Sequence, residues 1–141
     1  MAKNFFFLIV LVLTVFVVNS QTLNAQKEKR LNSSPQAFQT FFLKFKNTVR
    51  KSDKPGVAAM TLFPFDYGFD AGGEGTMSKA QFIKRFSEVF GKHRKLFFPE
   101  KNPLFSRGDD GAYTISTENA EHFVFVKKRN SFKLKSYIVE P

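Results

Sequence analysis

The sequence predicts an α+β fold in which N-terminal helices pack on one face of a curved, mainly antiparallel sheet. Apolar residues recur at steps of three and four across residues 38–49 and 82–90, which is the spacing of one helix face. Across residues 112–139 the apolar period changes to two, which is typical of strands with one buried face. Helices that precede a run of strands are the element order of α+β domains.

The first 25 residues predict a cleavable export signal. Lys3 supplies the positive start, and Phe5 to Val18 are apolar except for Thr14. Such a run is too short to span a bilayer, which needs about 20 apolar residues, so a cleaved signal is favoured over an anchor. Cleavage can follow Ser20 or Ala25, and we expect the second position. The sequence therefore predicts a secreted or periplasmic protein.

Composition limits the partners that we expect. The chain has no cysteine, so a packed apolar core must supply its stability. It has 20 phenylalanines and no tryptophan, and the 16 phenylalanines after the predicted signal can fill such a core. Some of these rings can also line a pocket for a small apolar ligand. A formal net charge of +10 favours anionic partners, which outside the cytoplasm means an anionic envelope component. Export makes nucleic acid an unexpected partner, and a homodimer stays open.

Residues 26–33 are polar and lack periodicity, which predicts a disordered leader before a single domain over residues 34–141. The domain begins with a long helix, for which Ser34 is the expected N-cap and Pro35 the first helical residue. The apolar stripe of this helix consists of Phe38, Phe41, Phe42, Phe45 and Val49.

A second, shorter helix is expected through residues 57–62, with Ser52 or Asp53 as its N-cap. Pro64 ends this helix because a proline favours an extended residue in front of it. The glycine-rich residues 65–76 predict an extended piece followed by a flexible loop.

A third helix has the clearest local signal. Ser78 and Gln81 have the spacing of a capping box, and Met77 and Phe82 occupy the two positions of a hydrophobic staple. The helix is expected to end at Gly91 in a left-handed turn. Its apolar face consists of Phe82, Ile83, Phe86, Val89 and Phe90.

The rest of the chain predicts strands. Residues 95–98 are a strand candidate, and residues 99–111 read as a loop. Aromatic and β-branched runs then predict strands over residues 112–117, 122–127 and 132–139, of which the last two form a hairpin. Alternation places Lys133, Lys135 and Tyr137 on one, solvent-exposed face of the last strand. Its apolar face would consist of Phe132, Leu134 and Ile138.

This order of elements resembles the NTF2-like family of cone-shaped α+β proteins, including its small exported bacterial members. The resemblance rests on the helices at 38–49 and 78–90, the short helix ending at Phe63-Pro64 and the strands at 112–139, and not on a motif. A cystatin-like or other α+β sandwich is the main alternative. The resemblance implies a pocket between the long helix and the concave face of the sheet. Some members use this pocket for catalysis with Asp, Tyr or His, and many only bind or assemble.

We expect a binding or assembly module with such an apolar pocket, and a small pocket enzyme is the alternative. An enzyme would use Asp66, Tyr67, Tyr113 or His122, and would need at least two of them to converge. The residues expected to line the pocket are Phe41, Phe45, Tyr67, Tyr113 and His122.

Basic residues form three groups in the sequence. The first two are Lys44, Lys46, Arg50, Lys51 and Lys54, and Lys92, Arg94 and Lys95. The third is the candidate anion surface and consists of Lys127, Lys128, Arg129, Lys133 and Lys135. The alternative is that this third group only keeps the domain soluble and binds no anion. An anion surface would be larger if the third group shared a face with either of the others, and this convergence stays open.

No cofactor or metal is expected. His93 lies among basic residues and far along the chain from His122, and cysteine is absent, so a zinc site is not predicted. Asp66, Asp70 and Glu74 could hold a hard cation, but their spacing differs from that of an EF-hand. The sequence also has neither a phosphate-binding glycine loop nor a GxSxG nucleophile turn.

Overall fold

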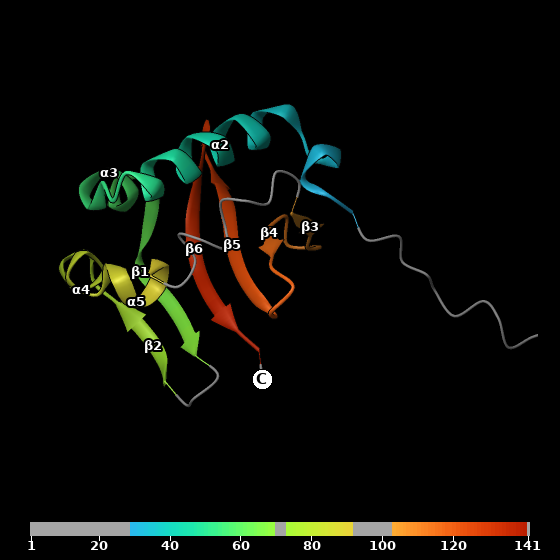
Figure 1. Ribbon diagram of the computed structural model, residues 1–141. Helices are drawn as coiled ribbons and strands as arrows, with labels where there is room; N and C mark the ends of the chain where they lie inside the picture. The colour runs from blue at the N-terminus through green and yellow to red at the C-terminus, as the bar shows by residue number, and fades with distance from the viewer. Residues whose placement is uncertain (1–28, 70–72, 92–102, 141) are drawn as a thin grey trace, which may run out of the picture.

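The computed structural model of the protein describes residues 29–69, 73–91 and 103–140. Six strands form one sheet in the order β2-β1-β6-β5-β4-β3, and the described helices lie on one side of it (Figure 1). Strands β1 and β6 are parallel, and the other neighbouring strands are antiparallel. The predicted α+β class with a mainly antiparallel sheet is therefore confirmed.

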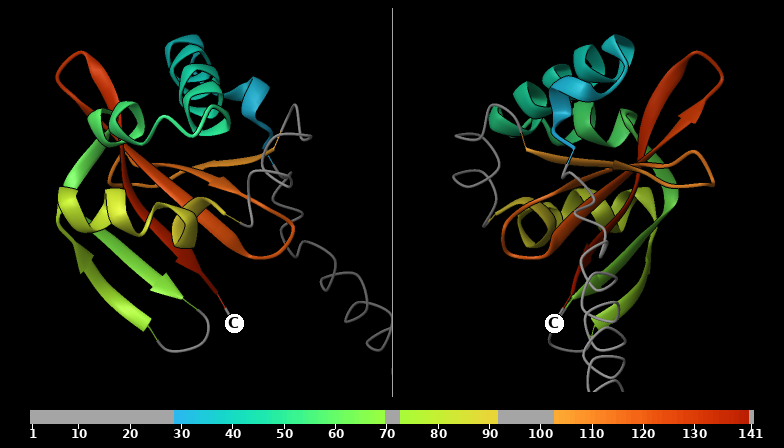
Figure 2. Two further views of the ribbon diagram at one scale, coloured as in Figure 1. Left: turned by 60° about the vertical axis from the view of Figure 1, so that its left-hand side comes forward. Right: turned by 90° about the vertical axis from the view of Figure 1, so that its right-hand side faces the viewer.

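Each element has the following bounds. The helices are η1 (Leu31–Ser33), α2 (Gln36–Arg50), α3 (Lys54–Ala59), α4 (Lys79–Lys84) and α5 (Phe86–Phe90). The strands are β1 (Thr61–Phe69), β2 (Gly73–Met77), β3 (Leu104–Arg107), β4 (Tyr113–Ser116), β5 (Glu121–Lys128) and β6 (Ser131–Val139). The sheet curves around α4 and α5, as the two views of Figure 2 show. We call the face that the helices cover the inner face and the opposite face the outer face.

Helix α2 forms where the apolar spacing predicts it, but it is capped one residue later than expected. Pro35 is the N-cap, with ψ 139°, and makes no side-chain cap hydrogen bond. The Ser34 hydroxyl instead donates to the carbonyl of Leu31 at 2.7 Å, because η1 ends directly before it. Along the predicted stripe Phe41 is only half-buried. The fully buried residues of α2 are Phe38, Phe42, Phe45 and Val49.

Helix α3 begins as predicted and ends early. The Asp53 carboxylate accepts a hydrogen bond from the amide of Gly56 at 2.9 Å, which is N-capping. The helix stops at Ala59 and does not reach residue 62, because Thr61 opens strand β1. The Thr61 hydroxyl donates to the carbonyl of Val57 at 2.9 Å, which satisfies one of the free carbonyls at the helix end.

The glycine-rich segment contains a strand that the sequence did not predict. Residues 73–77 form β2, which pairs with β1 from Phe65↔Met77 to Phe69↔Gly73. Phe65 and Met77 lie opposite each other and are both fully buried, so their packing favours strand over loop despite the glycines. Gly75 has φ 157°, and a Cβ there would lie 3.3 Å from the Tyr67 hydroxyl, so glycine suits this close approach.

The capping box of the third predicted helix is confirmed, but the helix is broken in two. The amide of Ser78 donates to the Gln81 side chain at 2.8 Å, and the amide of Gln81 donates to the Ser78 hydroxyl at 3.3 Å. Arg85 then leaves the helical conformation at φ −93°, ψ 17° and separates α4 from α5. Gly91 is right-handed, with φ −62°, so the predicted left-handed turn is wrong. Its backbone keeps the helical conformation of α5.

Strand β3 lies inside the segment 99–111 that reads as a loop, and it pairs with β4. Residues 29–31, from the predicted leader, lie along the other edge of β3. The amide of Phe105 donates to the carbonyl of Lys29 at 2.8 Å, and the amide of Leu31 donates to the carbonyl of Pro103 at 2.9 Å. The strand predicted at 95–98 lies outside the described residues.

The predicted hairpin of β5 and β6 is confirmed, but a β-bulge changes which residues of β6 face inward. Phe125 pairs with Leu134 whereas Val124 pairs with Ser136, so Lys135 is an extra residue in β6. Beyond the bulge the alternation is reversed. Tyr137, predicted beside the lysines, is 2% exposed on the inner face, and Ile138, predicted as buried, is 41% exposed on the outer face.

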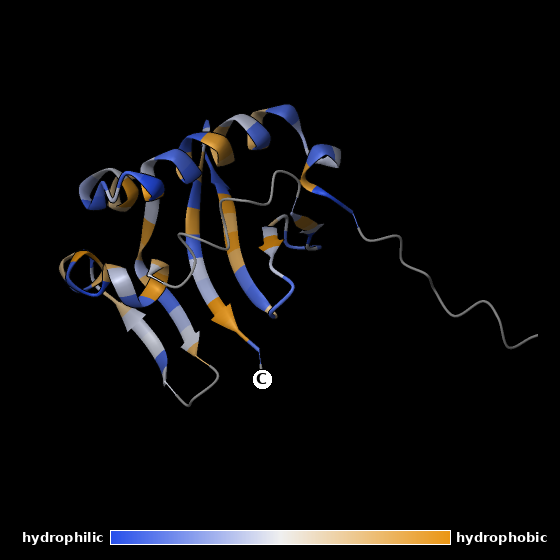
Figure 3. Ribbon diagram, viewed as in Figure 1, coloured by the Kyte–Doolittle hydropathy of each residue, from blue (hydrophilic) through white to orange (hydrophobic). Residues whose placement is uncertain are grey.

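Phenylalanine rings fill the space between the helices and the inner face. The ring centroid of Phe38 lies 4.7 Å from that of Tyr113 and 5.2 Å from that of Phe132. From α5, the ring of Phe90 stacks 6.1 Å from that of Phe123 on β5. Figure 3 shows how apolar and polar positions alternate along α2. The prediction that most of these rings form the core is confirmed for the described residues.

Candidate functional site

The structure does not bring the five predicted pocket residues together. Phe45 is fully buried and Tyr113 is 5% exposed, and both are packed within the aromatic core. Phe41 is half-buried against that core. Tyr67 is half-buried on the inner face, where the guanidinium of Arg85 lies 5.0 Å from its ring centroid. The fifth residue is His122 on β5, which faces the outer side of the sheet.

The residues proposed for a pocket enzyme are likewise divided between the two faces. Asp66 lies between the inward-facing residues of β1 and pairs with Ser136, so it belongs to the outer face. His122 also belongs to the outer face, because its neighbour Phe123 is fully buried on the inner face. Tyr67 and Tyr113 lie on the inner face. Asp66 and His122 therefore do not converge with Tyr67 or Tyr113 on one face of the sheet.

A polar contact inside the sheet escaped the sequence analysis. Tyr137 donates a long hydrogen bond of 3.5 Å to Glu121, and Thr117 donates to the second carboxylate oxygen of Glu121 at 3.2 Å. Burial raises the pKa of the Tyr137 phenol above its usual range, and the charge of Glu121 adds to the rise. Tyr137 is therefore a neutral hydrogen-bond donor at physiological pH. Only the bulge at Lys135 turns it inward, and no local pattern indicates that bulge.

Three polar side chains form a row on the outer face. The hydroxyl of Ser116 and Nδ1 of His122 lie 2.8 Å apart, across the pair that joins β4 to β5. Nε2 of His122 lies 3.6 Å from a carboxylate oxygen of Glu140. Glu140 is exposed, so this contact can tighten or open without disturbing the core. The row links the ends of three strands.

Metal-ligating residues do not gather in the part of the chain that the structure describes. Within residues 29–69, 73–91 and 103–140, no three histidine or acidic side chains lie close enough to hold a metal ion. Of the loop acids, Asp66 is half-buried and Glu74 is exposed on β2, while Asp70 and His93 lie outside the described residues. No helix within the same ranges is long and apolar enough to cross a membrane.

A cavity of about 450 Å³ lies where β4 ends beside β5. The last pair between these strands is Tyr113↔Phe125, so residues 126–128 of β5 continue past β4 and pair only with β6 among the described strands. The turn at Asp110 and Gly111 borders the space that β4 leaves. We call this cavity the basic notch. Its lining residues are Leu62, Arg107, Asp110, Gly111, Tyr113, Val126, Lys127, Lys128 and Lys135.

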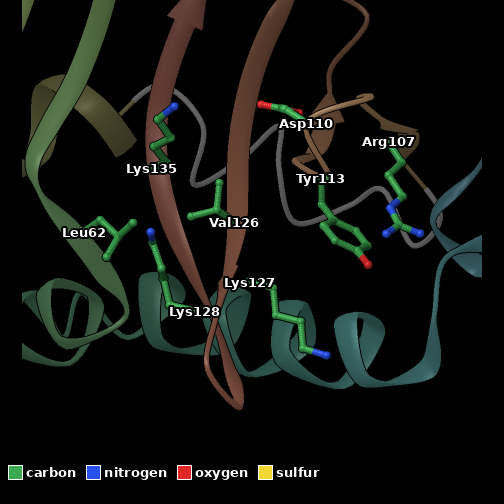
Figure 4. A pocket seen from close by; sticks show the side chains of 9 residues that line it. Leu62, Arg107, Asp110, Tyr113, Val126, Lys127, Lys128 and Lys135 are labelled. Carbon is green, nitrogen blue, oxygen red and sulfur yellow. The ribbon is translucent and has the colours of Figure 1, made fainter.

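Four cationic side chains line the basic notch, and Asp110 is its one acidic lining residue. A carboxylate oxygen of Asp110 accepts a hydrogen bond from the amide of Ala112 at 3.0 Å, so part of its hydrogen-bonding capacity serves the turn. Figure 4 shows Lys128 and Lys135 on one side of Val126 and Arg107 on the other. Cations that converge from β3, β5 and β6 on one cavity create a positive potential that attracts anions.

Arg107 is the notch cation that the sequence did not predict, because it falls in the segment that reads as a loop. It ends β3, pairs with Tyr113, and holds its guanidinium 5.4 Å from the Tyr113 ring centroid. This cation–π contact orients the guanidinium at one side of the notch. The short apolar pair Leu104-Phe105 between Pro103 and Gly108 is the signal that could have indicated the strand.

The predicted anion surface is divided by the fold. Lys127, Lys128 and Lys135 line the basic notch. The ammonium group of Lys133 donates instead to the carbonyl of Ala59 at the end of α3. Arg129 lies at the exposed tip of the hairpin with φ 52°.

The other two basic groups do not extend the notch among the described residues. From the first group, Arg50 and Lys51 line a separate cavity of about 420 Å³ with Asn47, at the end of α2. The second group, at residues 92–95, lies outside the described residues.

Comparison with known proteins supports the fold and goes no further. No protein-family model and no curated protein matches the chain. Among solved structures, ActVI-ORFA from Streptomyces coelicolor is 16% identical, with a TM-score of 0.50 over 73% of this chain and 93% of that one. Aln2 from another Streptomyces isolate is 14% identical, with a TM-score of 0.49 over 76% of this chain and 91% of that one. The likeness to ActVI-ORFA supports an NTF2-like fold for this chain, and at 16% identity it shows the fold alone.

Proposed function

We propose that this chain is an exported binding module that holds an anionic ligand in the basic notch. The observation that carries the proposal is the convergence of Arg107, Lys128 and Lys135 from three strands on one cavity of about 450 Å³. This volume lies within the usual range of ligand pockets, about 300–1,000 Å³. The aromatic filling of the inner face also supports binding at the notch, because Phe38, Phe45 and their neighbours occupy the interior where a cone pocket was expected.

Titration calorimetry with inorganic tripolyphosphate tests the anion binding. We expect binding that weakens steeply with added salt, because exposed charges are screened within about 10 Å at 0.1 M ionic strength. The double variant Lys128→Gln/Lys135→Gln should bind about tenfold more weakly, since it removes two of the four cations. Its matched control is Lys79→Gln/Lys84→Gln on α4, which removes the same charge away from the notch.

Two results would contradict anion binding at this place. If both double variants lose the same affinity, only the net charge of the protein matters and the notch has no special role. If the parent protein does not bind tripolyphosphate at low salt, the cations only solubilise the domain.

Export is a separate part of the proposal and needs its own test. Its support is the apolar run from Phe5 to Val18 behind Lys3, with small residues after it. N-terminal sequencing of protein recovered from outside the cytoplasm of its own host should begin at Gln26. A chain that begins at Met1 or Ala2 in that fraction would show that no signal is removed.

A pocket enzyme is the second candidate, and the buried contact between Tyr137 and Glu121 is the observation that favours it. Both groups are titratable and both lie in the interior, on strands β6 and β5. The two proposals are separable, because Glu121→Gln and Tyr137→Phe change the interior and leave the notch cations in place. If binding is the function, both variants keep the parent affinity for tripolyphosphate.

A further inference from the structure

We infer that the ligand of the basic notch is a single-chain amphiphilic anion, with its phosphate or carboxylate head among the notch cations and its alkyl chain along the outer face. This inference rests on the proposed anion binding and adds the chemical class of the ligand. It follows from apolar surface inside and beside the notch, and from the distribution of charge around that surface.

The notch has aliphatic walls as well as cations. Leu62 of β1 and Val126 of β5 are half-buried and line the same cavity as Lys128 and Arg107 (Figure 4). A small hydrated anion gains nothing from aliphatic surface, whereas an alkyl group next to the anionic head would remove that surface from water. The lining of the notch therefore suits an anion that carries hydrocarbon.

Apolar surface continues from the notch along the outer face. Val124 and Val126 point to the same side of β5, about 6.6 Å apart. One further step along the strand His122 pairs with Ile138, whose side chain is 41% exposed. We call Val124, Val126 and Ile138 the apolar stripe. None of the described helices covers the outer face (Figure 2). Ile138 is exposed, and Val124 and Val126 are half-buried, so the stripe offers apolar surface to an alkyl chain.

Charge is distributed unevenly along the stripe, which fixes the direction of the ligand. Lys128 and Lys135 lie at the notch end. The carboxylate of Glu140 lies at the far end, beside His122, and Asp66, which pairs with Ser136, lies level with Val124 in the middle of the stripe. An anionic head is attracted to the first end and repelled from the second, so the alkyl chain must run from the notch towards Ile138.

The same geometry favours a free amphiphile over a membrane surface. The notch is a recess between strands, and a head that enters it brings its own chain onto the stripe. A lipid in a bilayer keeps its chain inside the hydrocarbon core, so only its head could reach the notch and the stripe would stay unused. We therefore commit to a dissolved single-chain ligand.

A series of phosphates with growing chains tests the inference. The probes are inorganic phosphate, hexyl phosphate and decyl phosphate, each titrated calorimetrically below its micelle concentration. Decyl phosphate should bind at least tenfold more tightly than hexyl phosphate, since each methylene that is fully buried contributes up to about fourfold. Decyltrimethylammonium, with the same chain and the opposite charge, should bind at least tenfold more weakly than decyl phosphate.

The double variant Val124→Thr/Ile138→Thr tests the stripe directly. Threonine keeps a β-branched side chain that suits a strand but replaces alkyl surface with a hydroxyl. We expect the difference between hexyl and decyl phosphate to fall to about threefold or less, while the affinity for inorganic phosphate stays unchanged. Leu43→Gln is the matched control, because Leu43 is 59% exposed on α2 and away from the stripe.

The outcomes separate this inference from the proposed function. If phosphate binds with salt sensitivity but chain length has no effect, the amphiphile is wrong and anion binding stands. If the alkylammonium binds as tightly as decyl phosphate, the anionic head has no role and the amphiphile is wrong. If no phosphate binds, both are wrong.

Two further results identify a different occupant of the outer face. Vesicles of equal parts phosphatidylcholine and phosphatidylglycerol that bind when decyl phosphate does not would indicate a membrane surface. A dimer in sedimentation that the stripe variant dissociates would indicate a second copy. Either result overturns the inference.

Discussion

The same strands form both faces of the sheet, yet the two faces differ in the burial and in the charge of their side chains. On the inner face, Phe123 and Phe125 of β5 are fully buried under the rings of α2 and α5. On the outer face, Val124 and Val126 of the same strand are only half-buried, and cationic side chains stand at the end of the strand. If the basic notch binds an anion as proposed, stability and ligand binding should be separable in this protein, because alternate residues of one strand point to opposite faces.

The bulge at Lys135 decides which residues of β6 belong to which face, and inserting one alanine opposite it, between Val124 and Phe125, should have the largest effect. The insertion would give Lys135 a partner and let the alternation continue unbroken, so Phe123 and Tyr137 would turn outward. We expect the insertion variant to lose cooperative urea unfolding measured by circular dichroism. The substitution Lys135→Ala should change the free energy of unfolding by less than about 0.5 kcal/mol. Equal stability of the insertion variant and the parent would show that the bulge does not assign the faces.

Truncating one ring of the inner face should have the next largest effect. Phe86→Ala should lower the free energy of unfolding by about 3–5 kcal/mol, because the side chain is 1% exposed and leaves a cavity. Phe41→Ala should cost less, because Phe41 is only half-buried. On the outer face, Ile138→Ala should cost less than about 1 kcal/mol. Urea titrations of the three variants measure the comparison, and a cost for Ile138→Ala equal to that for Phe86→Ala would contradict it.

The phenol of Tyr137 should make the inner face sensitive to high pH. Its pKa is raised in the folded protein, chiefly by burial, whereas an unfolded tyrosine titrates near pH 10. The stabilisation of the folded state by the protonated Tyr137 phenol is therefore fully present below about pH 10. It is lost as the pH rises towards the folded pKa, and the free energy of unfolding falls by up to about 1.4 kcal/mol per pH unit. Melting temperatures at pH 8 and pH 11 should differ less for Tyr137→Phe than for the parent. An identical difference would show that Tyr137 ionises equally easily in both states.

Removing charge from the outer face should have the smallest effect on stability. The variant Lys128→Gln/Lys135→Gln should unfold within about 0.5 kcal/mol of the parent, because exposed charges contribute little to folding. The same variant is expected to bind the anion about tenfold more weakly, so this change on the outer face would lower the affinity and leave the stability unchanged. A loss of more than about 2 kcal/mol would mean that the notch lysines are structural.

Local signals in the sequence predicted much of the inner face. The step of three and four in α2, the capping box of α4 and the alternation in β4 and β5 each depend on residues close together in the chain. Strands β2 and β3 were missed because each is stabilised by pairing with a neighbouring strand and not by the preferences of its own residues. Glycine-rich residues 73–77 have little intrinsic preference for a strand and become one only against β1.

The candidate site was predicted less completely, and for the same reason. Lysines 127, 128 and 135 were recognised from their charge, but their convergence with Arg107 depends on where β4 ends beside β5. The positions of Tyr137 and Ile138 depend on one extra residue opposite β5, and a period of two read along β6 alone cannot indicate it. The sequence therefore indicated which residues could bind an anion, but it did not indicate the strand register that brings them together.

The pairing of residues 29–31 with β3 also affects how the sheet behaves in a crowded solution. An open strand edge is a template on which other chains can add, and it leads to aggregation. Here one edge of the sheet is covered by the chain itself, through the hydrogen bonds of Lys29 and Leu31. The opposite edge, β2, is short and has the charged Glu74 among exposed residues. Neither edge of the sheet therefore favours pairing with another chain, which limits fibre growth in a protein that is rich in phenylalanine.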